Sequence, residues 1–401
     1  KVVANLNRGI VPLPEPDLEK IVAANIKKGR LHYTTDFRSL KECDVLWITF
    51  DTPVDENDSA NTKEIFTYIK KSLPYLKDNI LIITSSQLPV ESGKKITNFI
   101  KKHRKNLIFD YAYIPENLRL GEAVESFMKP SRIVIGVDGD TRKKELIGIF
   151  EKLETTVLTV NVQSAEMIKH ATNAYLSTSL SFIYDIADIC ETVGADITQV
   201  AKGLRADTRI GMGAYLDASA GFSGGHLTRD LQYLQKIAKT KRLKLPVITS
   251  VIDKNTNRPE IIFKKLTPLL KTFKNKTVTF LGLTYKSGTP TLVRSLPLMV
   301  AKKMLGKGAH LNLCDPFVDK DELKKEMNWR NFTFFKDPYK AVCDADAIIC
   351  ITPWGELKKL DFAKIGNAMK SPKLFFDARN YFLDEKVVIE KSGINYIGVG
   401  R

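Results

Sequence analysis

Short apolar runs alternate with helical patterns through the first third of the chain, and this alternation limits the fold more than any other feature. The runs are CDVLWITF, NILIITSS, NLIFDYAYIPE and SRIVIGV. Between them lie amphipathic segments such as NTKEIFTYIKKSLPYL and ESGKKITNFIKKH. The pattern predicts an α/β fold in which helices cover a parallel sheet. Ligands of such sheets bind at the carboxyl ends of strands, where Thr52, Pro53, Ser85 and Ser86 stand.

The last third starts a second nucleotide-binding-like unit. KTVTFLGLTYKSGTPTLVRSLPLMVAKKMLGKGAHLNLCDP gives a strand, a glycine turn, a helix and a strand that ends in Asp315. The segments AIICITPW and KLFFDARN complete a second doubly wound sheet. Considered alone, this unit resembles a degenerate dinucleotide site, because Gly282 and Gly288 flank a phosphate-sized turn and Asp315 stands where a ribose ligand is expected.

The middle third is helical and contains a glycine-rich turn. An uninterrupted helical pattern runs from Ala165 through Thr192, with Gly194 as its stop. Downstream, GFSGGHLTRD places three glycines and His226 at the start of an amphipathic helix that we expect to begin near Leu227. Glycines permit close ligand approach, and helix N-terminal amides attract anions. The turn is therefore interpreted as an active-site loop.

Polar residues spaced four apart accompany this loop. Lys169 and Asn173 lie on one face of the long helix, where they can stabilise a developing oxyanion. The alternative for Lys169 is an ordinary exposed lysine. Asp230 follows His226 by four residues, and a lone aspartate there also fits a simple interaction with the helix N-terminus.

Composition excludes some classes of protein. The formal charge of +16, from 62 basic and 46 acidic residues, suits an anionic ligand but also nucleic acid. The lysine pairs are spread over amphipathic helices without a nucleic-acid motif, so we expect no nucleic-acid partner. Five cysteines without a CxxC pair, no apolar run of about 20 residues and no hydrophobic signal segment predict a cytoplasmic protein with no membrane association. The five histidines lack metal-ligand spacing, so we expect no metal.

The ordered set of motifs resembles the UDP-glucose/GDP-mannose dehydrogenase family over essentially all 401 residues. It comprises SAEMIKHATNAYLSTSLSFIYDIADICETVGADITQVAKGLRADTRIG, GFSGGHLTRD, GLTYKSGTPTLVRS and FDAR. The resemblance implies two Rossmann-like doubly wound domains joined by a long central helix and a helical connector. Residues 1–160 would bind NAD, residues 161–258 would supply the dimer contact and the catalytic loop, and residues 259–401 would bind a UDP-sugar.

The resemblance also implies a reaction and its residues. The family uses NAD to oxidise the C6 alcohol of a UDP-hexose, most often UDP-glucose, to a uronic acid for polysaccharide synthesis. Lys169 and Asn173 would stabilise oxyanions, and Asp230 would activate water. The cofactor positions implied are Thr52, Pro53, Ser86, Lys286 and Arg294. The substrate positions implied are Phe222, Gly225, Arg379 and Arg209, the last reaching across a homodimer.

Two departures from the family pattern leave alternatives open. The family loop carries a nucleophilic cysteine in the column that His226 occupies here. His226 is thus a general base, a substrate-positioning residue or an inert replacement. Leu120 stands where several members carry a glutamate that assists thioester hydrolysis, and Glu122 is a candidate substitute. The alternative functions are an enzyme that makes one hydride transfer only and a non-catalytic sugar-nucleotide-binding protein.

The N-terminal sequence raises a separate expectation. A dinucleotide-binding domain opens with a strand, a G-x-G-x-x-G turn, a helix and a second strand. KVVANLNRG instead resembles the helix that follows the family's second strand, and the first βαβ unit with its glycine motif is missing from the printed chain. We expect an N-terminally incomplete domain, and we favour truncated numbering or a fragment over natural loss.

Overall fold

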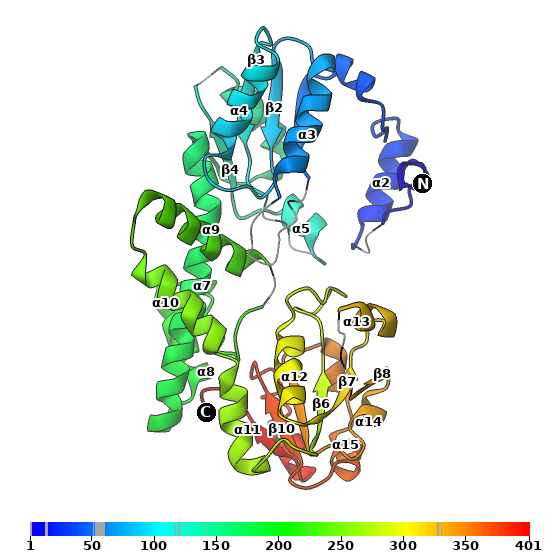
Figure 1. Cartoon of the computed structure of the whole chain (residues 1–401), viewed down its shortest axis with the longest axis vertical. Helices are drawn as coiled ribbons and strands as arrows, with labels where there is room; N and C mark the ends of the chain where they lie inside the picture. Colours follow the sequence, from blue (N-terminus) through cyan, green and yellow to red (C-terminus); the bar gives the residue numbers. More distant parts are fainter. Residues whose placement is uncertain are drawn as a thin grey trace. The chain divides into compact units, whose positions relative to one another are not determined.

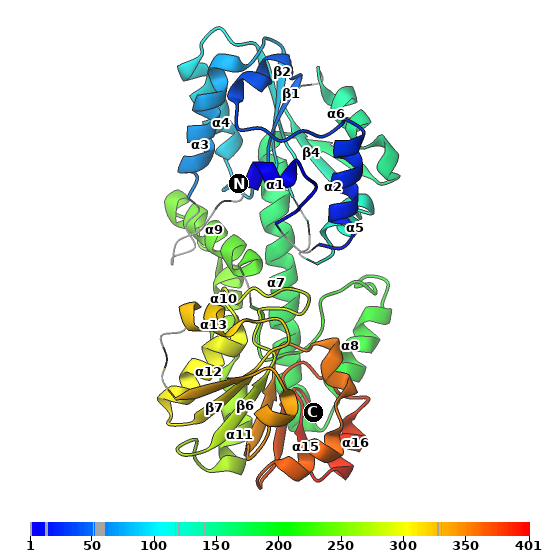
Figure 2. The same cartoon turned by 90° about the vertical axis from the view of Figure 1, so that its right-hand side faces the viewer.

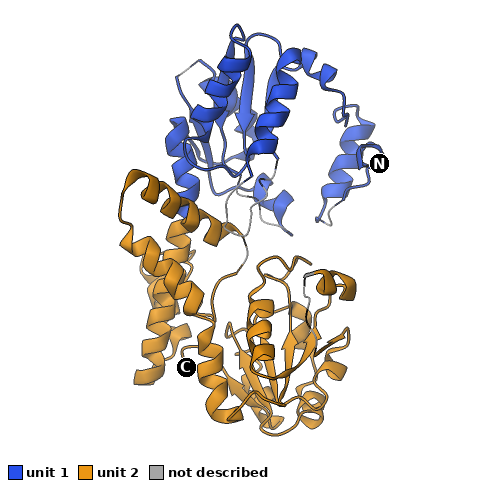
Figure 3. Cartoon of the chain, in the orientation of Figure 1, with its two compact units in different colours: residues 1–172 blue, residues 173–401 orange. Residues whose placement is uncertain are grey.

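The computed structural model describes residues 2–12, 15–50, 52, 61–116, 118, 121–139, 141–223, 225–326, 329 and 331–401. The chain divides into two compact units, residues 1–172 and 173–401 (Figure 3). The border falls within the 32-residue helix α7, Val162–Val193. The predicted helix over Ala165–Thr192 is therefore confirmed. The predicted functional division at residues 160 and 258 stays a prediction.

The first unit is built on a sheet that includes β1, β2, β3 and β4 (Figures 1 and 2). The sheet has five strands in the order β1-β2-β3-β4-β5. Its strands are β1 Val45–Ile48, β2 Ile80–Thr84, β3 Phe109–Tyr113, β4 Ile133–Val137 and β5 Val157–Val160. Alternate residues of β2 join different cores. Ile82 packs in the cluster with Ile96 of α4, and Ile83 packs in the cluster with Leu146 of α6. This period of two is what a strand buried on both faces requires.

The prediction of a fully parallel first sheet is wrong at one pair. Strands β3 and β4 are antiparallel, with Ala112 opposite Val137 and Tyr113 opposite Gly136, while the other neighbours in this sheet are parallel. The described part of the connection between them contains only the helix α5, Ala123–Met128. Six helical residues span roughly 9 Å, less than the roughly 16 Å of a five-residue strand, so this helix does not return the chain to the opposite end of the sheet.

The other helices of the first unit are short. They are α1 Val2–Leu6, α2 Leu18–Lys27, α3 Lys63–Ser72, α4 Ser92–His103 and α6 Lys143–Ile149, with 3-10 turns at Phe37–Glu42, Leu73–Tyr75 and Glu151–Leu153. Glu166, on the part of α7 that belongs to this unit, supports the N-terminus of α4. Its carboxylate accepts hydrogen bonds from the Glu91 and Gly93 amides, each at 2.7 Å. The start of α4, beside the end of β2, is thereby fixed to α7.

The second unit contains a six-stranded parallel sheet with strand order β11-β10-β9-β6-β7-β8. Its strands are β6 Thr277–Leu281, β7 His310–Cys314, β8 Phe332–Phe335, β9 Ala347–Cys350, β10 Leu374–Asp377 and β11 Asn395–Ile397. The order reverses between β6 and β9, which is the switch point of a doubly wound sheet. The predicted α/β class with two Rossmann-like domains is confirmed.

Helices surround this second sheet and form the connector. They are α8 Ile197–Ala206, α9 His226–Lys241, α10 Pro246–Asn257, α11 Glu260–Leu270, α12 Leu296–Gly306, α13 Lys320–Glu326, α14 Pro338–Ala341, α15 Phe362–Ala368 and α16 Lys386–Lys391, with a 3-10 turn at Gly355–Lys359. Helix α9 begins at His226, one residue before the predicted start. Within the described ranges, no helix is both long and apolar enough to span a bilayer.

Candidate functional site

Side chains from other elements hold the backbone of the glycine-rich loop, which we define as residues 219–226. The Phe222 amide donates to Asn255 Oδ1 at 2.9 Å, and Asn255 Nδ2 donates to the Phe222 carbonyl at 3.0 Å. The Ala220 amide donates to the carbonyl of Ala378, just after β10, at 3.0 Å. A Cβ at Gly221, whose φ is +126°, would lie 3.3 Å from Asn255 Oδ1. Glycine is therefore needed at this position; Gly224 lies outside the described residues.

The glycine-rich loop also contacts the segment that follows β6. Ser223 Oγ donates to the Tyr285 carbonyl at 2.9 Å. A Cβ built on Gly225 would lie 4.0 Å from Arg294 Nη1. Burial raises the pKa of the Tyr285 phenol, which keeps it protonated at neutral pH. Within the second unit, the structure thus brings together Gly225, a predicted substrate position, and Arg294, a predicted cofactor position.

Two predicted catalytic residues meet at the base of the loop. Asn173 Nδ2 donates a hydrogen bond to Asp230 Oδ2, which joins positions 57 residues apart in sequence. Asp230 is fully buried on α9. His226, the first residue of that helix, is exposed, and its Nδ1 lies 3.5 Å from Arg229 Nη2. The site therefore combines a half-buried amide, a buried carboxylate and an accessible imidazole.

Lys169 lies on α7 four residues before Asn173, in the part of the helix that belongs to the first unit. Its side chain is buried, and Nζ donates to the Glu116 carbonyl at 2.5 Å. An ordinary surface lysine would be exposed, so the alternative of an exposed helix lysine is wrong. Leu120, near Glu116 in the sequence, lies outside the described residues.

The carboxyl edge of the first sheet places two predicted cofactor residues. Thr52 and Ser86 are both buried, and Thr52 Oγ1 donates to the Gln87 carbonyl at 2.6 Å. Ser86 Oγ has no hydrogen-bond partner among the residues that the structure describes. A buried hydroxyl left without a partner is costly, and this suits an oxygen that an absent ligand would contact. Pro53 lies outside the described residues.

The remaining predicted ligand residues are spread over the second unit. Lys286 is half-buried in the turn after β6. Arg379 follows β10, and its Nε donates to the Ile351 carbonyl at 3.0 Å. Arg209 is exposed and forms an ion pair with Asp207 at 2.7 Å. Phe222 is buried inside the loop. Among the described ligand candidates, Arg209 and Arg379 are thus the exposed ones.

The interpretation of Asp315 as a ribose ligand is wrong. Asp315 is fully buried, and its two oxygens accept from three backbone amides and from Trp354 Nε1, at 2.7 to 3.1 Å. Gly282 likewise has a packing reason, because a Cβ there would lie 2.1 Å from the Thr352 carbonyl oxygen. Asp315 and Gly282 thus join the loops that follow β6, β7 and β9 to one another.

No cysteine lies in the glycine-rich loop. All five cysteines carry free thiols, and burial, followed by the Asp315 charge, raises the pKa of Cys314 to about 12. A thiol with that pKa is a poor nucleophile at neutral pH. Over the described part of the chain, His, Cys, Asp and Glu form no group of three that would hold a metal ion.

Sequence reasoning missed the residues that hold the loop in place. Asn255 and Arg258 lie on and just after α10, more than 30 residues after the backbone groups they contact. A polar pair three residues apart on an amphipathic helix is normally solvated. The one available signal was the Asn-x-x-Arg spacing after a glycine-rich loop, and it is not specific.

Comparisons with known proteins agree with this architecture. Residues 1–154 match the NAD binding domain of the UDP-glucose/GDP-mannose dehydrogenase family, residues 163–257 its central domain and residues 279–384 its UDP binding domain. The UDP-glucose 6-dehydrogenase of Rickettsia bellii is 33% identical over 99% of this chain and 91% of that protein. The UDP-glucose 6-dehydrogenase TuaD of Bacillus subtilis is 32% identical over 100% and 86%.

A solved structure has the same fold. The UDP-glucose dehydrogenase of Pyrobaculum islandicum superimposes with a TM-score of 0.87, covering 99% of this chain and 89% of that one, at 24% identity. The family match over three consecutive segments, together with relatives above 30% identity along nearly the whole chain, leaves one assignment. The chain belongs to the UDP-glucose/GDP-mannose dehydrogenase family.

Proposed function

We propose that this protein is an NAD-dependent nucleotide-sugar 6-dehydrogenase that oxidises the C6 alcohol of a UDP-hexose, with UDP-glucose as the substrate. The uronic acid product would serve polysaccharide synthesis. The family membership and the names of the relatives support this activity. The observation that carries the proposal is the Asn173 to Asp230 hydrogen bond beneath the glycine-rich loop. It joins two of the residues that we assign to the reaction.

The chain supplies groups for proton and charge transfer. Bound NAD would accept the hydride in each oxidation. The Lys169 ammonium and the Asn173 amide are the donors assigned to oxyanions that develop at C6. Asp230 is buried next to Asn173, and its carboxylate is assigned the activation of water. Conversion of the alcohol to the aldehyde releases one hydride and one proton; conversion of the aldehyde hydrate to the acid releases the same again.

His226 is assigned the role of general base toward the aldehyde hydrate. Its ring is exposed at the N-terminus of α9, and its Nδ1 faces the Arg229 guanidinium at 3.5 Å. An imidazole is a competent proton acceptor near neutral pH. Oxidation through the aldehyde hydrate forms no covalent intermediate with the enzyme. This route therefore suits a glycine-rich loop that has no thiol.

NAD is assigned to the carboxyl edge of the first sheet. The unpartnered, buried Ser86 hydroxyl there fits a ligand contact, and Thr52 and Pro53 follow the neighbouring strand β1. Lys286 and Arg294 are assigned to the same cofactor as cationic groups. On this basis residues 1–160 form the NAD-binding domain, residues 161–258 the central domain and residues 259–401 the UDP-sugar domain.

Phe222, Gly225 and Arg379 are assigned to the UDP-sugar. Phe222 and Gly225 belong to the glycine-rich loop, and Arg379 follows Ala378, whose carbonyl accepts the Ala220 amide of that loop. A guanidinium provides paired donors for diphosphate oxygens. Arg209 is assigned to the UDP-sugar of a partner subunit.

A second copy of this chain is proposed to cover the exposed apolar face of α7. Tyr175, Phe182 and Ile189 recur every seven residues and are 72%, 49% and 55% exposed. Met212, three residues after Arg209 in the segment that follows α8, is 77% exposed. Contiguous exposed apolar side chains mark interaction surfaces. A Phe182→Glu variant should sediment as a monomer where wild type sediments as a dimer, and a wild-type monomer would contradict the dimer.

A cytoplasmic location is proposed on the free thiols of all five cysteines, three of which are buried. Free cysteines persist in reducing compartments. Fractionation of cells that make the tagged protein tests this, and recovery outside the cytoplasm would contradict it.

The function is tested by counting NADH formed per UDP-glucose consumed, for wild type and for His226→Ala. Two NADH per sugar in wild type, lost in the variant, is the expected result. One NADH per sugar would replace the complete oxidation with a reaction that stops at the aldehyde. No NADH with any sugar nucleotide of a panel would overturn the enzyme in favour of a binding protein.

A further inference from the structure

Helix α10 and the residue after it hold the first half of the glycine-rich loop by its backbone. We propose that Asn255 and Arg258 are positioning residues that set the geometry of residues 219–222 for the reaction. Four observations carry this inference: the pair of hydrogen bonds between Asn255 and the Phe222 backbone, the hydrogen bond that Arg258 donates, the burial of Arg258 and the pairing of its charge with Asp188. The inference rests on the proposed function, because it assigns these residues to the loop of that same site.

Asn255 matches the backbone of Phe222 on both of its polar groups. The amide oxygen accepts from the Phe222 N–H, and the amide nitrogen donates to the Phe222 carbonyl, at 2.9 and 3.0 Å. A side-chain amide carries one such acceptor and one such donor in a plane, which fixes the direction of the bound peptide. Gly221 permits this approach because a Cβ would lie 3.3 Å from Asn255 Oδ1.

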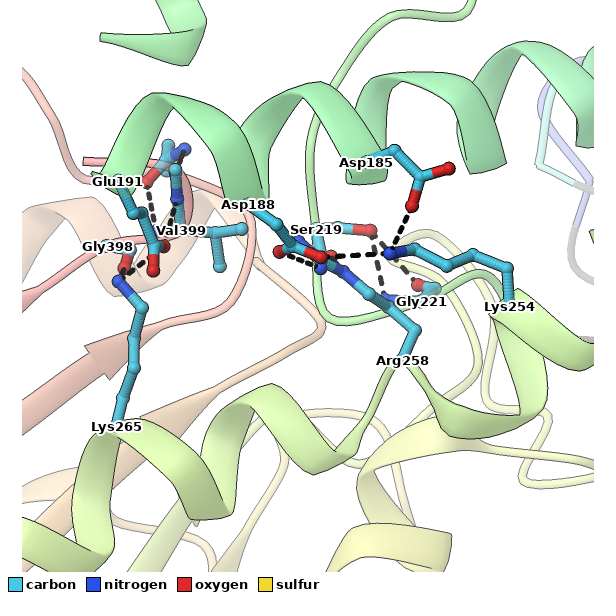
Figure 4. A network of polar contacts seen from close by, with 12 residues as sticks. Asp185, Asp188, Glu191, Ser219, Gly221, Lys254, Arg258, Lys265, Gly398 and Val399 are labelled. Atoms are coloured by element: carbon cyan, nitrogen blue, oxygen red, sulfur yellow. Dashed lines mark hydrogen bonds and ion pairs between the residues drawn. The ribbon is translucent and has the colours of Figure 1, made fainter. Parts of the chain in front are cut away.

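Arg258 holds the preceding turn. Its Nε donates to the Ser219 carbonyl at 2.9 Å (Figure 4). The guanidinium also lies 5.0 Å from the centre of the Tyr184 ring. The Tyr184 hydroxyl in turn contacts Ser219 Oγ at 2.9 Å. Ser219 is therefore fixed at both its backbone and its side chain.

Acidic side chains of α7 compensate the charge of Arg258. Asp188 accepts from Arg258 Nη1 and from Lys254 Nζ, and Lys254 also pairs with Asp185 at 2.5 Å (Figure 4). Burial acts to raise the pKa of Asp188, but hydrogen bonds and charges of Arg258 and Lys254 outweigh it and lower that pKa. The Arg258 side chain is only 3% exposed, and a buried cation needs such a fixed partner.

These contacts place the loop relative to α7, which carries Asn173. Asn173 in turn donates to Asp230 of α9. Catalysis is sensitive to small displacements, since a misplacement of about 1 Å can lower a rate about 100-fold. Release of the loop at Phe222 should therefore impair turnover even though Asn255 is not assigned to substrate or cofactor.

The test compares Asn255→Ala with Asn257→Ala in the whole protein. Asn257 is a matched control, because its Nδ2 bonds only to the Asp253 carbonyl in the same helix among the contacts described. Asn255→Ala is expected to lower kcat with UDP-glucose about tenfold or more and to raise its KM, with KM for NAD within about twofold of wild type. For Asn257→Ala, kcat, the KM for UDP-glucose and the KM for NAD should each stay within about twofold of the wild-type value.

Loss of folded protein would lower kcat in proportion and leave both KM values unchanged, and that outcome would overturn a positioning role. A second variant, Asn255→Asp, retains the shape and the acceptor but donates to the Phe222 carbonyl only when protonated. Arg258, a charged group that is paired with Asp188, lies with Asn255 near Gly221. The ratio of its kcat to that of wild type should rise as pH is lowered; a flat ratio would overturn the role of the donor.

Hydrogen exchange separates this inference from the proposed function. In the ligand-free protein, amides in a peptide spanning residues 219–223 should exchange faster in Asn255→Ala than in wild type, while the sheet of the second unit stays unchanged. If wild type makes no NADH, the proposed function fails and the exchange result still decides whether Asn255 holds the loop. Unchanged exchange in this peptide would overturn the inference.

Discussion

At the carboxyl edge of the first sheet, the Ser86 hydroxyl is buried and has no hydrogen-bond partner among the described residues, whereas at the same edge of the second sheet each oxygen of Asp315 accepts two hydrogen bonds. Both edges follow apolar strands and carry residues that the sequence marks as ligand candidates. The first edge therefore has a hydroxyl available to bond a ligand. At the second edge, the hydrogen bonds that the Asp315 carboxylate accepts all come from the protein itself.

A nucleotide-binding pattern therefore has two physical explanations. A glycine after a strand can leave room for phosphate, or it can let another backbone approach, as Thr352 approaches Gly282. An acidic residue after the next strand can bind a ribose or join loops of the sheet. The number of hydrogen bonds that the acidic side chain already makes within the protein decides between a ribose-binding and a loop-joining role.

Asp315→Ala should have the strongest effect on stability. Removal of the carboxylate leaves three backbone amides and the Trp354 indole without their acceptor, and we expect a loss of about 4 kcal/mol in the free energy of unfolding. Denaturant unfolding measures it. Asp319→Ala, which removes an exposed acceptor of the Asp321 amide, should cost about 1 kcal/mol or less. Equal stability with weakened nucleotide binding would restore the ribose interpretation and remove the difference between the two edges.

Gly282→Ala should follow in size. Its new Cβ would meet the Thr352 carbonyl oxygen at 2.1 Å in a backbone conformation with φ of +89°, so a cost of about 3 kcal/mol or more is expected. Gly288 is the matched control, because it has a similar φ of +83° but no atom within 4 Å of the Cβ position. Gly288→Ala should cost about 1 kcal/mol. Similar melting temperatures for the two variants would contradict the packing explanation.

Ser86→Ala tests the first edge. Because the hydroxyl has no partner in the described protein, its removal should change stability by less than about 1 kcal/mol while it weakens NAD binding about tenfold. Titration calorimetry with NAD checks the affinity. Ser85→Ala should do the opposite, since Ser85 Oγ accepts from Trp47 Nε1 at 2.8 Å in a contact within the protein. Unchanged NAD affinity in Ser86→Ala would remove Ser86 from the cofactor site.

The sequence predicted what depends on periodicity and order of motifs. The two α/β units and the long helix α7 follow from apolar runs and spacing, and these were found. The antiparallel pair of β3 and β4 was missed, because strand direction depends on the connection and not on the apolar pattern. Asn255 and Arg258 were missed because a side chain that binds a distant backbone carbonyl or amide leaves no pattern in sequence.

Glu166 should show the weakest effect, although it is the counterpart of Asp315 in the first unit, a fully buried carboxylate that accepts backbone amides. Burial raises its pKa, and the hydrogen bonds from Gly93 and Glu91 only partly oppose this. The folded chain therefore binds the proton more tightly than the unfolded chain, whose glutamate pKa is about 4.3. The stabilising contribution is fully present below that pH and is lost as pH rises through the folded pKa. The free energy of unfolding of wild type and of Glu166→Gln, measured from below about pH 4 to neutral pH, checks this expectation. If the stability advantage of wild type instead grew with pH, the hydrogen bonds from the Glu91 and Gly93 amides, and not burial, would dominate the pKa of Glu166.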